Sequence, residues 1–218
     1  MNSKAKKYFF LVVVASGSFL VLLNQTLLNP AYPAIMQDYN IDSATVQLLD
    51  SGFNMVNAIM VPIAAFLLDK YSSKRILIGS MFIFLFGTLC ALFAPGFYFV
   101  LLGRLIQGIA AGILMPVGTT LFLWSFPPEK RGFAMGLWGI CIGAGPLLGP
   151  IVSGLIIDNF NWQNIFYVDI ALGIVIIVAM VCIYNMQSPV TSDTKLHIPS
   201  IILSSFGLGL LLYGLSMI

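Results

Sequence analysis

The chain has 218 residues, of which 59% are hydrophobic and only 8% are charged, and its formal net charge is +2. A soluble domain carries about 25% charged residues, so this composition excludes a soluble globular domain and indicates a protein that folds in a lipid bilayer. The three cysteines lie in apolar runs, where they act as small core-filling side chains, and the single histidine lies in a polar connector. Without a metal-ligand cluster, nucleophile motif or phosphate loop, the sequence does not indicate an enzyme.

Apolar runs long enough to cross a membrane recur along the whole chain. A spanning helix needs about 20 mainly apolar residues. The first run follows Lys4, Lys6 and Lys7, but no signal-peptidase site follows it, so we interpret it as a retained first span and not as a secretory signal. The predicted spans are roughly 8–30, 46–68, 76–94, 98–125, 133–157, 164–186 and 198–217.

The connectors between these spans alternate in charge. Basic residues precede the first span and follow the second, fourth and sixth, whereas the connectors after the first, third and fifth contain no base. Because cytoplasmic connectors are enriched in Lys and Arg, this alternation predicts a cytoplasmic N-terminus. The basic residues are Lys4, Lys6, Lys7, Lys70, Lys74, Arg75, Lys130, Arg131 and Lys195.

Two short segments resemble each other, three spans apart. Residues 65–71 and 154–160 both read small, three large apolar, Asp, polar, aromatic, and they lie on opposite sides of the predicted membrane. This pattern predicts an inverted three-plus-three repeat, as found in many secondary transporters. We therefore predict a six-helix bundle over 1–186, a cytoplasmic connector over 187–197 and a seventh spanning helix over 198–218, after which the chain looks truncated.

Two ionisable residues, Arg104 and Asp50, lie within predicted spans, and Asn24 lies at a similar depth. A charge in lipid is costly, so these side chains should face the bundle interior and find partners. Gln107 and Asn54 extend the polar layer by one helical turn each. Arg104 is either a structural clamp or part of a coupling site, and Asp50 is either an interfacial residue that reaches water or a protonatable partner of Arg104.

A second group of charges follows the second predicted span. Asp69 comes at the end of the span, and Lys74 and Arg75 follow within a short turn. The group is either a basic loop that only sets topology or a charge latch that bridges to a neighbouring helix end.

Four glycines and two prolines fall between residues 139 and 150 in the fifth predicted span. Glycines four residues apart let another helix backbone come close, and the prolines each remove a backbone donor. We predict a bent, closely packed helix that acts as a moving joint against central helices. Its residues are Gly139, Gly143, Gly145, Pro146, Gly149 and Pro150.

Several motifs resemble those of the major facilitator superfamily. Residues 65–75 are similar to its loop motif Gly-x-Leu-x-Asp-Arg-x-Gly-Arg-Lys-Arg, although Ala65, Lys70, Ser72 and Ser73 depart from it. Residues 104–108 match the fourth-helix motif Arg-x-x-Gln-Gly, and 143–150 resemble the fifth-helix antiporter motif. Residues 23–29 with Pro33 resemble the first-helix motif of the fourteen-span drug:proton antiporters of the EmrB/QacA type, and 162–167 resemble the motif that begins their helix six.

The resemblance implies an all-α membrane protein with a major-facilitator-like six-helix N-terminal bundle plus a seventh helix. It further implies proton-coupled multidrug efflux by alternating access in the plasma membrane, with the proton as coupling ion and no cofactor. The expected partners are amphipathic compounds, including cationic ones, membrane lipid and a missing C-terminal bundle, and no nucleic acid is expected. The residues expected to line the path are Asn24, Asp50, Asn54, Arg104, Gln107 and Met115.

One departure from the family concerns the coupling chemistry. The first-helix motif has Asp where this chain has Asn24, so the usual carboxylate is absent, and Asp50 in the same layer is a substitute by depth alone. Two other interpretations stay open: a specific metabolite exporter of the same superfamily, and a truncated half or assembly partner that does not transport.

Overall fold

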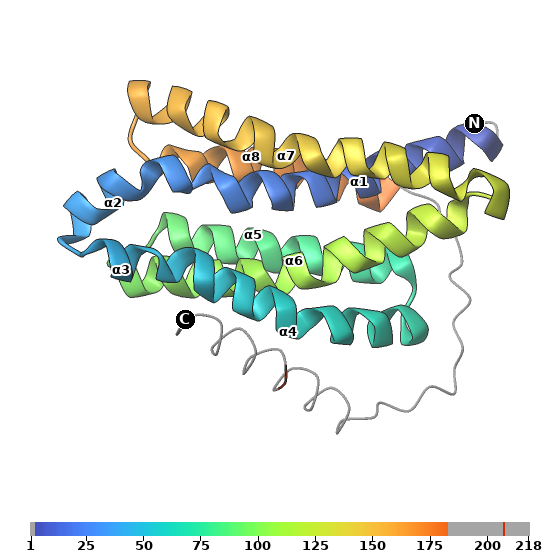
Figure 1. Cartoon of the computed structure of the whole chain (residues 1–218), viewed down its shortest axis with the longest axis horizontal. Helices are drawn as coiled ribbons and strands as arrows, with labels where there is room; N and C mark the ends of the chain where they lie inside the picture. The colour runs from blue at the N-terminus through green and yellow to red at the C-terminus, as the bar shows by residue number, and fades with distance from the viewer. Residues whose placement is uncertain (1–2, 183–206, 208–218) are drawn as a thin grey trace.

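The protein is described by a computed structural model that covers residues 3–182 and Gly207, with the side chains described from Lys7 onward. Six of the described helices are long and apolar enough to cross a membrane, and the described residues contain no strand (Figure 1). The elements are α1 (Ser3–Leu27), η1 (Asn29–Ala31), α2 (Tyr32–Tyr39), α3 (Ser43–Val46), α4 (Leu48–Lys70), α5 (Ser73–Leu92), α6 (Phe97–Ser125), η2 (Pro128–Lys130), α7 (Arg131–Asn159) and α8 (Asn164–Cys182).

The first six predicted spans each correspond to one long helix, and the main difference lies at the end of the first. There the chain does not leave the bundle at residue 30 but continues through η1 and α2 to Tyr39. Pro30 and Pro33 lie in the first two positions of η1 and α2, where the missing N–H costs no hydrogen bond. The predicted connector 187–197 and seventh span 198–217 lie outside the described residues, apart from Gly207.

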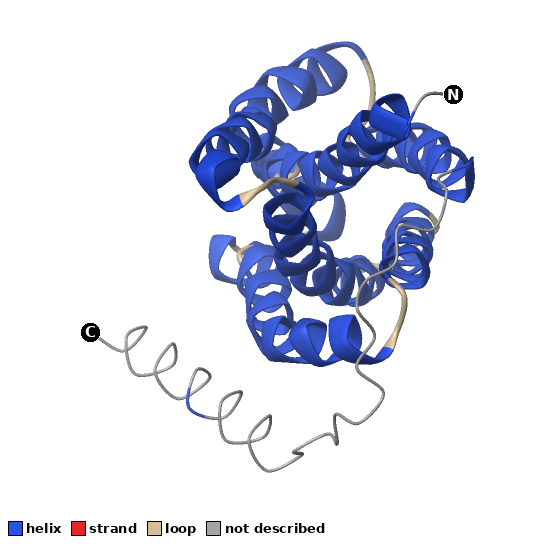
Figure 2. Cartoon of the chain, turned by 90° about the vertical axis from the view of Figure 1, so that its right-hand side faces the viewer, coloured by secondary structure: helices blue, strands red, loops and turns tan. Residues whose placement is uncertain are grey.

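Packing and burial follow the predicted inverted repeat. α4 packs mainly on α6, and its counterpart α7 packs mainly on α1. Figure 2 views the bundle along its long axis, so that the long helices are seen nearly end-on. The buried share of the most apolar window agrees within each pair of counterparts: 67% and 61% for α1 and α6, 17% and 17% for α4 and α7, and 44% and 39% for α5 and α8. α1 and α6 are therefore the central helices of the bundle, and α4 and α7 are its least covered.

Close backbone approach fixes α6 against α5. A Cβ at Gly87 would lie 2.7 Å from the carbonyl oxygen of Gly103, and a Cβ at Gly103 would lie 2.6 Å from the carbonyl oxygen of Gly87. Real Cβ atoms do not approach so closely, so both positions require glycine for this separation. The approach places the next residue, Arg104, in the middle of the bundle.

The glycines of α7 divide into two pairs with different surroundings. A Cβ at Gly145 would lie 3.0 Å from the backbone nitrogen of Leu23, and one at Gly149 would lie 3.2 Å from its carbonyl oxygen, so this pair packs on α1. Around Gly139 and Gly143, no described residue of another helix lies within 4 Å of an added Cβ. α7 continues as one helix through its two prolines. Close packing against a central helix therefore holds for one pair, and the other pair faces away from the described bundle.

An aromatic contact joins two connectors at the predicted outer end. The indole Nε1 of Trp162, just before α8, donates a hydrogen bond to Asp38 Oδ2 at 2.6 Å. The ring of Tyr39 meets Trp162 edge-on, with centroids 6.1 Å apart. The start of α8 is thereby tied to the end of α2.

Candidate functional site

Arg104 of α6 lies at the centre of a buried polar cluster, with no exposed surface. Its Nη1 donates to Asn24 Oδ1 at 2.6 Å and to Gln107 Oε1 at 3.1 Å. Its Nη2 lies 3.5 Å from Asp50 Oδ1, and the guanidinium lies over the ring of Phe53, 4.5 Å from its centroid. Since a guanidinium in a bilayer needs partners for its charge and its donors, α1, α4 and α6 each supply one.

The cluster extends from Arg104 to two further helices. Asn24 Nδ2 donates to Asp169 Oδ2 of α8 at 2.5 Å. Gln107 Nε2 donates to the Thr88 hydroxyl of α5 at 2.9 Å. Four helices thus contribute polar side chains to one hydrogen-bonded network inside an otherwise apolar bundle, and α4 joins it through the Asp50 ion pair.

The network has unused hydrogen-bonding capacity. Among the buried side-chain atoms of the described residues, Arg104 Nε and Nη2, Asp50 Oδ1, Asp169 Oδ1 and the Tyr32 hydroxyl have no hydrogen-bond partner. The Asp50 side chain is 31% exposed, whereas Asp169 is fully buried. Two carboxylates share one guanidinium here, so the cluster can take up a proton or an additional polar group.

Of the residues expected to line the transport path, Asn24, Asp50, Arg104 and Gln107 lie together in this cluster. Asn54 is exposed on α4, and its Oδ1 accepts a hydrogen bond from Gln25 Nε2 at 2.8 Å. Met115 lies further along α6 and is partly buried. None of the hydrogen bonds and ion pairs described here joins its side chain to the cluster.

The expected latch residues lie at the opposite end of the bundle. Asp69 is partly buried near the end of α4, and Arg75 is exposed on α5. Lys74 Nζ donates to the carbonyl oxygen of Val181 near the end of α8, at 2.7 Å. The amine of Lys74 therefore reaches a neighbouring helix end, which is the kind of bridge that a latch requires.

Asp169 is a third ionisable residue within the spans, so the expectation of only two was wrong. It is the sixth residue of α8 and its side chain is fully buried. The signal was present in the sequence, since a carboxylate in the first turns of a long apolar run is costly wherever it does not reach water. Tyr32 and Thr88 also belong to the buried polar layer but carried no comparable signal.

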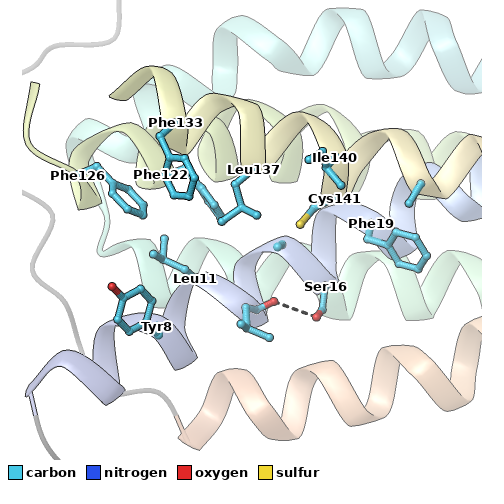
Figure 3. A pocket seen from close by; sticks show the side chains of 13 residues that line it. Tyr8, Leu11, Ser16, Phe19, Phe122, Phe126, Phe133, Leu137, Ile140 and Cys141 are labelled. Atoms are coloured by element: carbon cyan, nitrogen blue, oxygen red, sulfur yellow. Dashed lines mark hydrogen bonds between the residues drawn. The ribbon is translucent and has the colours of Figure 1, made fainter. Parts of the chain in front are cut away.

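An apolar pocket of about 470 Å³ opens between α1, α6 and α7 (Figure 3). Aromatic and aliphatic side chains dominate its lining, with Ser16 as its one hydroxyl besides Tyr8. The lining residues are Tyr8, Leu11, Val12, Ala15, Ser16, Phe19, Phe122, Phe126, Phe133, Leu137, Ile140, Cys141 and Ala144. Such a wall suits an amphipathic molecule and offers few groups for a specific polar one.

The described residues contain no group of three or more His, Cys, Asp or Glu side chains that could hold a metal ion. Cys90 and Cys141 are partly buried and Cys182 is exposed, and all three are free thiols. Their positions fit small side chains in helix contacts and at the bundle surface.

Comparison with known proteins gives one family. The model of the Major Facilitator Superfamily matches residues 14–217. The uncharacterized MFS-type transporter YcnB of Bacillus subtilis is 42% identical over 94% of this chain and 43% of its own length. The lincomycin resistance protein LmrB of B. subtilis is 34% identical, covering 92% of the chain and 42% of its own length, and the multidrug export protein EmrB of Haemophilus influenzae is 29% identical, covering 81% and 36%.

The chain therefore spans less than half the length of these relatives. The match nevertheless extends over nearly all of its residues, including the buried cluster and the helix with the paired glycines. The six long apolar helices agree with an integral membrane protein. The chain belongs to the Major Facilitator Superfamily of membrane transporters.

Proposed function

We propose that the chain is the N-terminal half of a proton-coupled multidrug exporter in the plasma membrane, with its N-terminus in the cytoplasm. Two relatives whose names state drug resistance or multidrug export, LmrB and EmrB, support the choice of drug efflux within the superfamily. The alternating basic connectors support the orientation.

The observation that carries the proposal is the buried cluster around Arg104. A fully buried guanidinium beside two carboxylates is costly in a membrane, and intramembrane ionisable groups of this kind mark ion and proton pathways. A carboxylate that is alternately protonated and deprotonated couples the proton gradient to the position of the helices that surround it.

The apolar pocket supports an amphipathic substrate. Its aromatic wall provides dispersion and stacking contacts that do not depend on one particular hydrogen-bonding pattern. At its edge, Lys7 Nζ already lies 5.0 Å from the centroid of the Phe126 ring. The Phe126 ring is therefore in a position to stack with a cationic group, and a cationic amphipathic compound would have to displace Lys7 to use it.

Transport by this chain requires a second bundle, supplied in cis or in trans. The exposed faces of α4 and α7 are the surfaces that we propose to meet it, so that rocking of one bundle against the other opens the path to alternate sides. The Lys74 contact with Val181 would close one end during this cycle.

A second candidate is export of one specific metabolite. The riboflavin transporter RibZ of Clostridioides difficile is 29% identical over 78% of the chain, and the substrate in its name favours this alternative. A third candidate is an assembly partner that does not itself transport. The observation behind it is that the chain covers only 43% of the length of YcnB.

Efflux from everted membrane vesicles tests the proposal. The product of the gene that encodes these residues is compared with the 218-residue chain alone, using ethidium, lincomycin and riboflavin, with and without an uncoupler. Drug:proton antiport predicts that ethidium and lincomycin both accumulate in the vesicles and that the uncoupler abolishes this accumulation. Accumulation of riboflavin alone would favour the metabolite exporter, and an effect of ATP but not of the uncoupler would overturn proton coupling.

A further inference from the structure

We propose that Asp169 of α8 is the acid that binds and releases the coupling proton, and that Asn24 is a neutral bridge between it and Arg104. The inference rests on the proposed proton coupling and adds the identity of the acid. It replaces Asp50, which the sequence suggested from depth alone, with a residue that the structure places in contact with Asn24.

The geometry links the three side chains in series. Arg104 Nη1 donates to Asn24 Oδ1 at 2.6 Å, and Asn24 Nδ2 donates to Asp169 Oδ2 at 2.5 Å. One end of the Asn24 amide thus contacts the cation, and the other contacts the carboxylate. A change of charge on Asp169 is transmitted through this amide to the guanidinium.

Counting the charges of the cluster shows room for one proton. Arg104 supplies one positive charge, and Asp50 and Asp169 supply two negative charges when both are ionised. The cluster is then left with a net charge of −1 in a bundle surrounded by lipid, which is unfavourable. Protonation of one carboxylate makes the cluster neutral, and its later release restores the −1 state.

The surroundings of Asp50 and Asp169 differ, and this difference indicates which of the two acids exchanges the proton. Asp50 Oδ1 lies 3.5 Å from Arg104 Nη2 in a direct ion pair, and the Asp50 side chain is 31% exposed. Asp169 is fully buried and is linked to Arg104 through the Asn24 amide, and its Oδ1, like that of Asp50, has no hydrogen-bond partner. Burial penalises the charged form, so Asp169 is the group that exchanges the proton, at Oδ1, while Asp50 stays as the counter-ion of Arg104.

Few other titratable groups bear on this exchange. The charged group that acts on Asp169 is Arg104 from α6, and α1 contributes only the Asn24 amide. Arg104 in turn faces Asp50 and Tyr32 as well as Asp169. A proton gained or lost at Asp169 is therefore registered mainly by Arg104 and its partners on α1 and α4.

The sequence departure at residue 24 fits the same assignment. The first-helix motif that the chain resembles has an acid at the position of Asn24. Here the amide occupies that position, and an acid faces it from α8 within one hydrogen bond. The position of the first-helix acid thus holds an amide here, and the carboxylate of the pair comes from α8.

Infrared difference spectroscopy of the purified 218-residue chain in nanodiscs tests the assignment without requiring transport. A pH change through the titration range reveals the carbonyl band of a protonated carboxyl group. The variants are Asp169→Asn, Asp50→Asn and the exchange variant Asn24→Asp/Asp169→Asn, with Asp158→Asn as a control for an exposed acid at the end of α7. Size-exclusion profile and helix content establish that each variant is folded.

We expect the titrating carboxyl band to be lost in Asp169→Asn and kept in Asp158→Asn. It should return in the exchange variant, which restores one acid to the pair even if the single variant folds poorly. In Asp50→Asn the band should remain but appear only at lower pH, because Asp169 is then the one counter-ion of Arg104 in the cluster. Loss of the band in Asp50→Asn with retention in Asp169→Asn would overturn the proposal in favour of Asp50. A band unchanged in both would exclude both acids.

A transport measurement separates this inference from the proposed function. In the gene product, Asp169→Asn should abolish uncoupler-sensitive ethidium accumulation, and the exchange variant should recover part of it. If the unaltered protein shows no uncoupler-sensitive efflux, the proposed function fails whatever the spectra show. If it does, and Asp169→Asn retains it fully, only the present inference fails.

Discussion

Helices α4 and α7 are counterparts in the inverted repeat, and each has only 17% of its most apolar window buried in the described bundle. Their chemistry is nevertheless different. α4 carries Asp50 and Asn54 and takes part in the buried polar cluster, whereas α7 carries no charge between Arg131 and Asp158 and contributes five residues to the apolar pocket. Helices at the same position of the two repeats therefore differ in chemistry: α4 carries charged and polar side chains, and α7 carries the apolar and small side chains of the pocket and of the close helix contact.

Under the proposed function, the polar cluster binds the proton and the apolar pocket binds the substrate, so the two sites lie at separate places in the bundle. α1 and α6 connect the two sites, since both contribute to the polar cluster and to the pocket. A change in the charge of the cluster can thus reach the pocket through the two central helices. The following substitutions test this division, from the largest expected effect to the smallest.

Replacement of Arg104 by Met should have the largest effect. It leaves Asp50 without its counter-ion and Asn24 and Gln107 without a donor, and removal of one partner from a buried ion pair costs about 3–5 kcal/mol. We expect a strongly lowered Tm in detergent. Cysteine pairs placed across the α4–α6 contact should cross-link less well, whereas pairs across α1–α7 should be affected less.

Arg104→Lys is the matched control for this effect. It keeps the charge but not the planar group that reaches both Asn24 and Asp50, so its Tm should fall between those of the native chain and Arg104→Met. A Tm for Arg104→Met equal to that of the native chain would contradict a clamping role for the cluster.

The two glycine pairs of α7 predict opposite results on one helix. In Gly149→Ala the new methyl group meets Thr26 and the Leu23 carbonyl, and overpacking of this kind costs about 1–3 kcal/mol. In Gly139→Ala the methyl group meets no described atom of another helix within 4 Å, so Tm should be unchanged or slightly higher. Thermal denaturation of both variants in detergent measures the difference.

A transport measurement tests the Gly139 face of α7 further. If the Gly139 face meets a second bundle, Gly139→Leu should lower ethidium efflux by the gene product while the Tm of the 218-residue chain is kept. Equal Tm losses at Gly139 and Gly149 would show that the two faces of α7 are packed alike.

The pocket on α7 predicts a weaker, binding-specific effect. Leu137→Asn places a polar amide in the apolar wall, and the lost apolar contact should weaken binding of a fluorescent amphipathic dye about threefold to tenfold. Leu155→Asn, on the same helix but outside the pocket, is the control. Fluorescence titration of the purified chain measures both, and equal weakening would show that the dye does not use this pocket.

The sequence predicted those features that depend on residues close together in the chain, and it missed those that depend on residues far apart. Apolar run length and connector charge act over one helix, so the six described spans could be predicted, and only the extension through Pro30 and Pro33 was missed. The Asn24–Asp169 hydrogen bond joins residues 145 positions apart, so no local pattern could indicate it. The Gly145 and Gly139 faces have the same spacing, and only the position of α1 distinguishes them.

The segments that lead into the two counterpart helices provide the smallest test. α4 is preceded by α3, whose N-cap Asp42 accepts a hydrogen bond from the Thr45 backbone N–H at 2.8 Å, whereas α7 is preceded by η2, which has no side-chain cap. The hydrogen bonds from Thr45 hold the pKa of the Asp42 carboxyl below its usual range. Because the folded pKa is lowered, the cap contributes at neutral pH, and its contribution is lost as the pH falls through that lowered pKa.

Asp42→Ala should therefore speed hydrogen exchange at the Thr45 amide at neutral pH and leave the amides of α7 unchanged. Its effect should shrink under acidic conditions, where the native carboxyl is protonated and accepts the hydrogen bond less well. Glu129→Ala, the corresponding removal of an exposed acid in η2, should leave exchange at the start of α7 nearly unchanged, because no side chain caps that segment. Equal changes in hydrogen-exchange rate at α3 and η2 would mean that α3 does not depend on its Asp42 cap. The segments before α4 and α7 would then be alike in this respect, and the two helices would differ only in their own side chains.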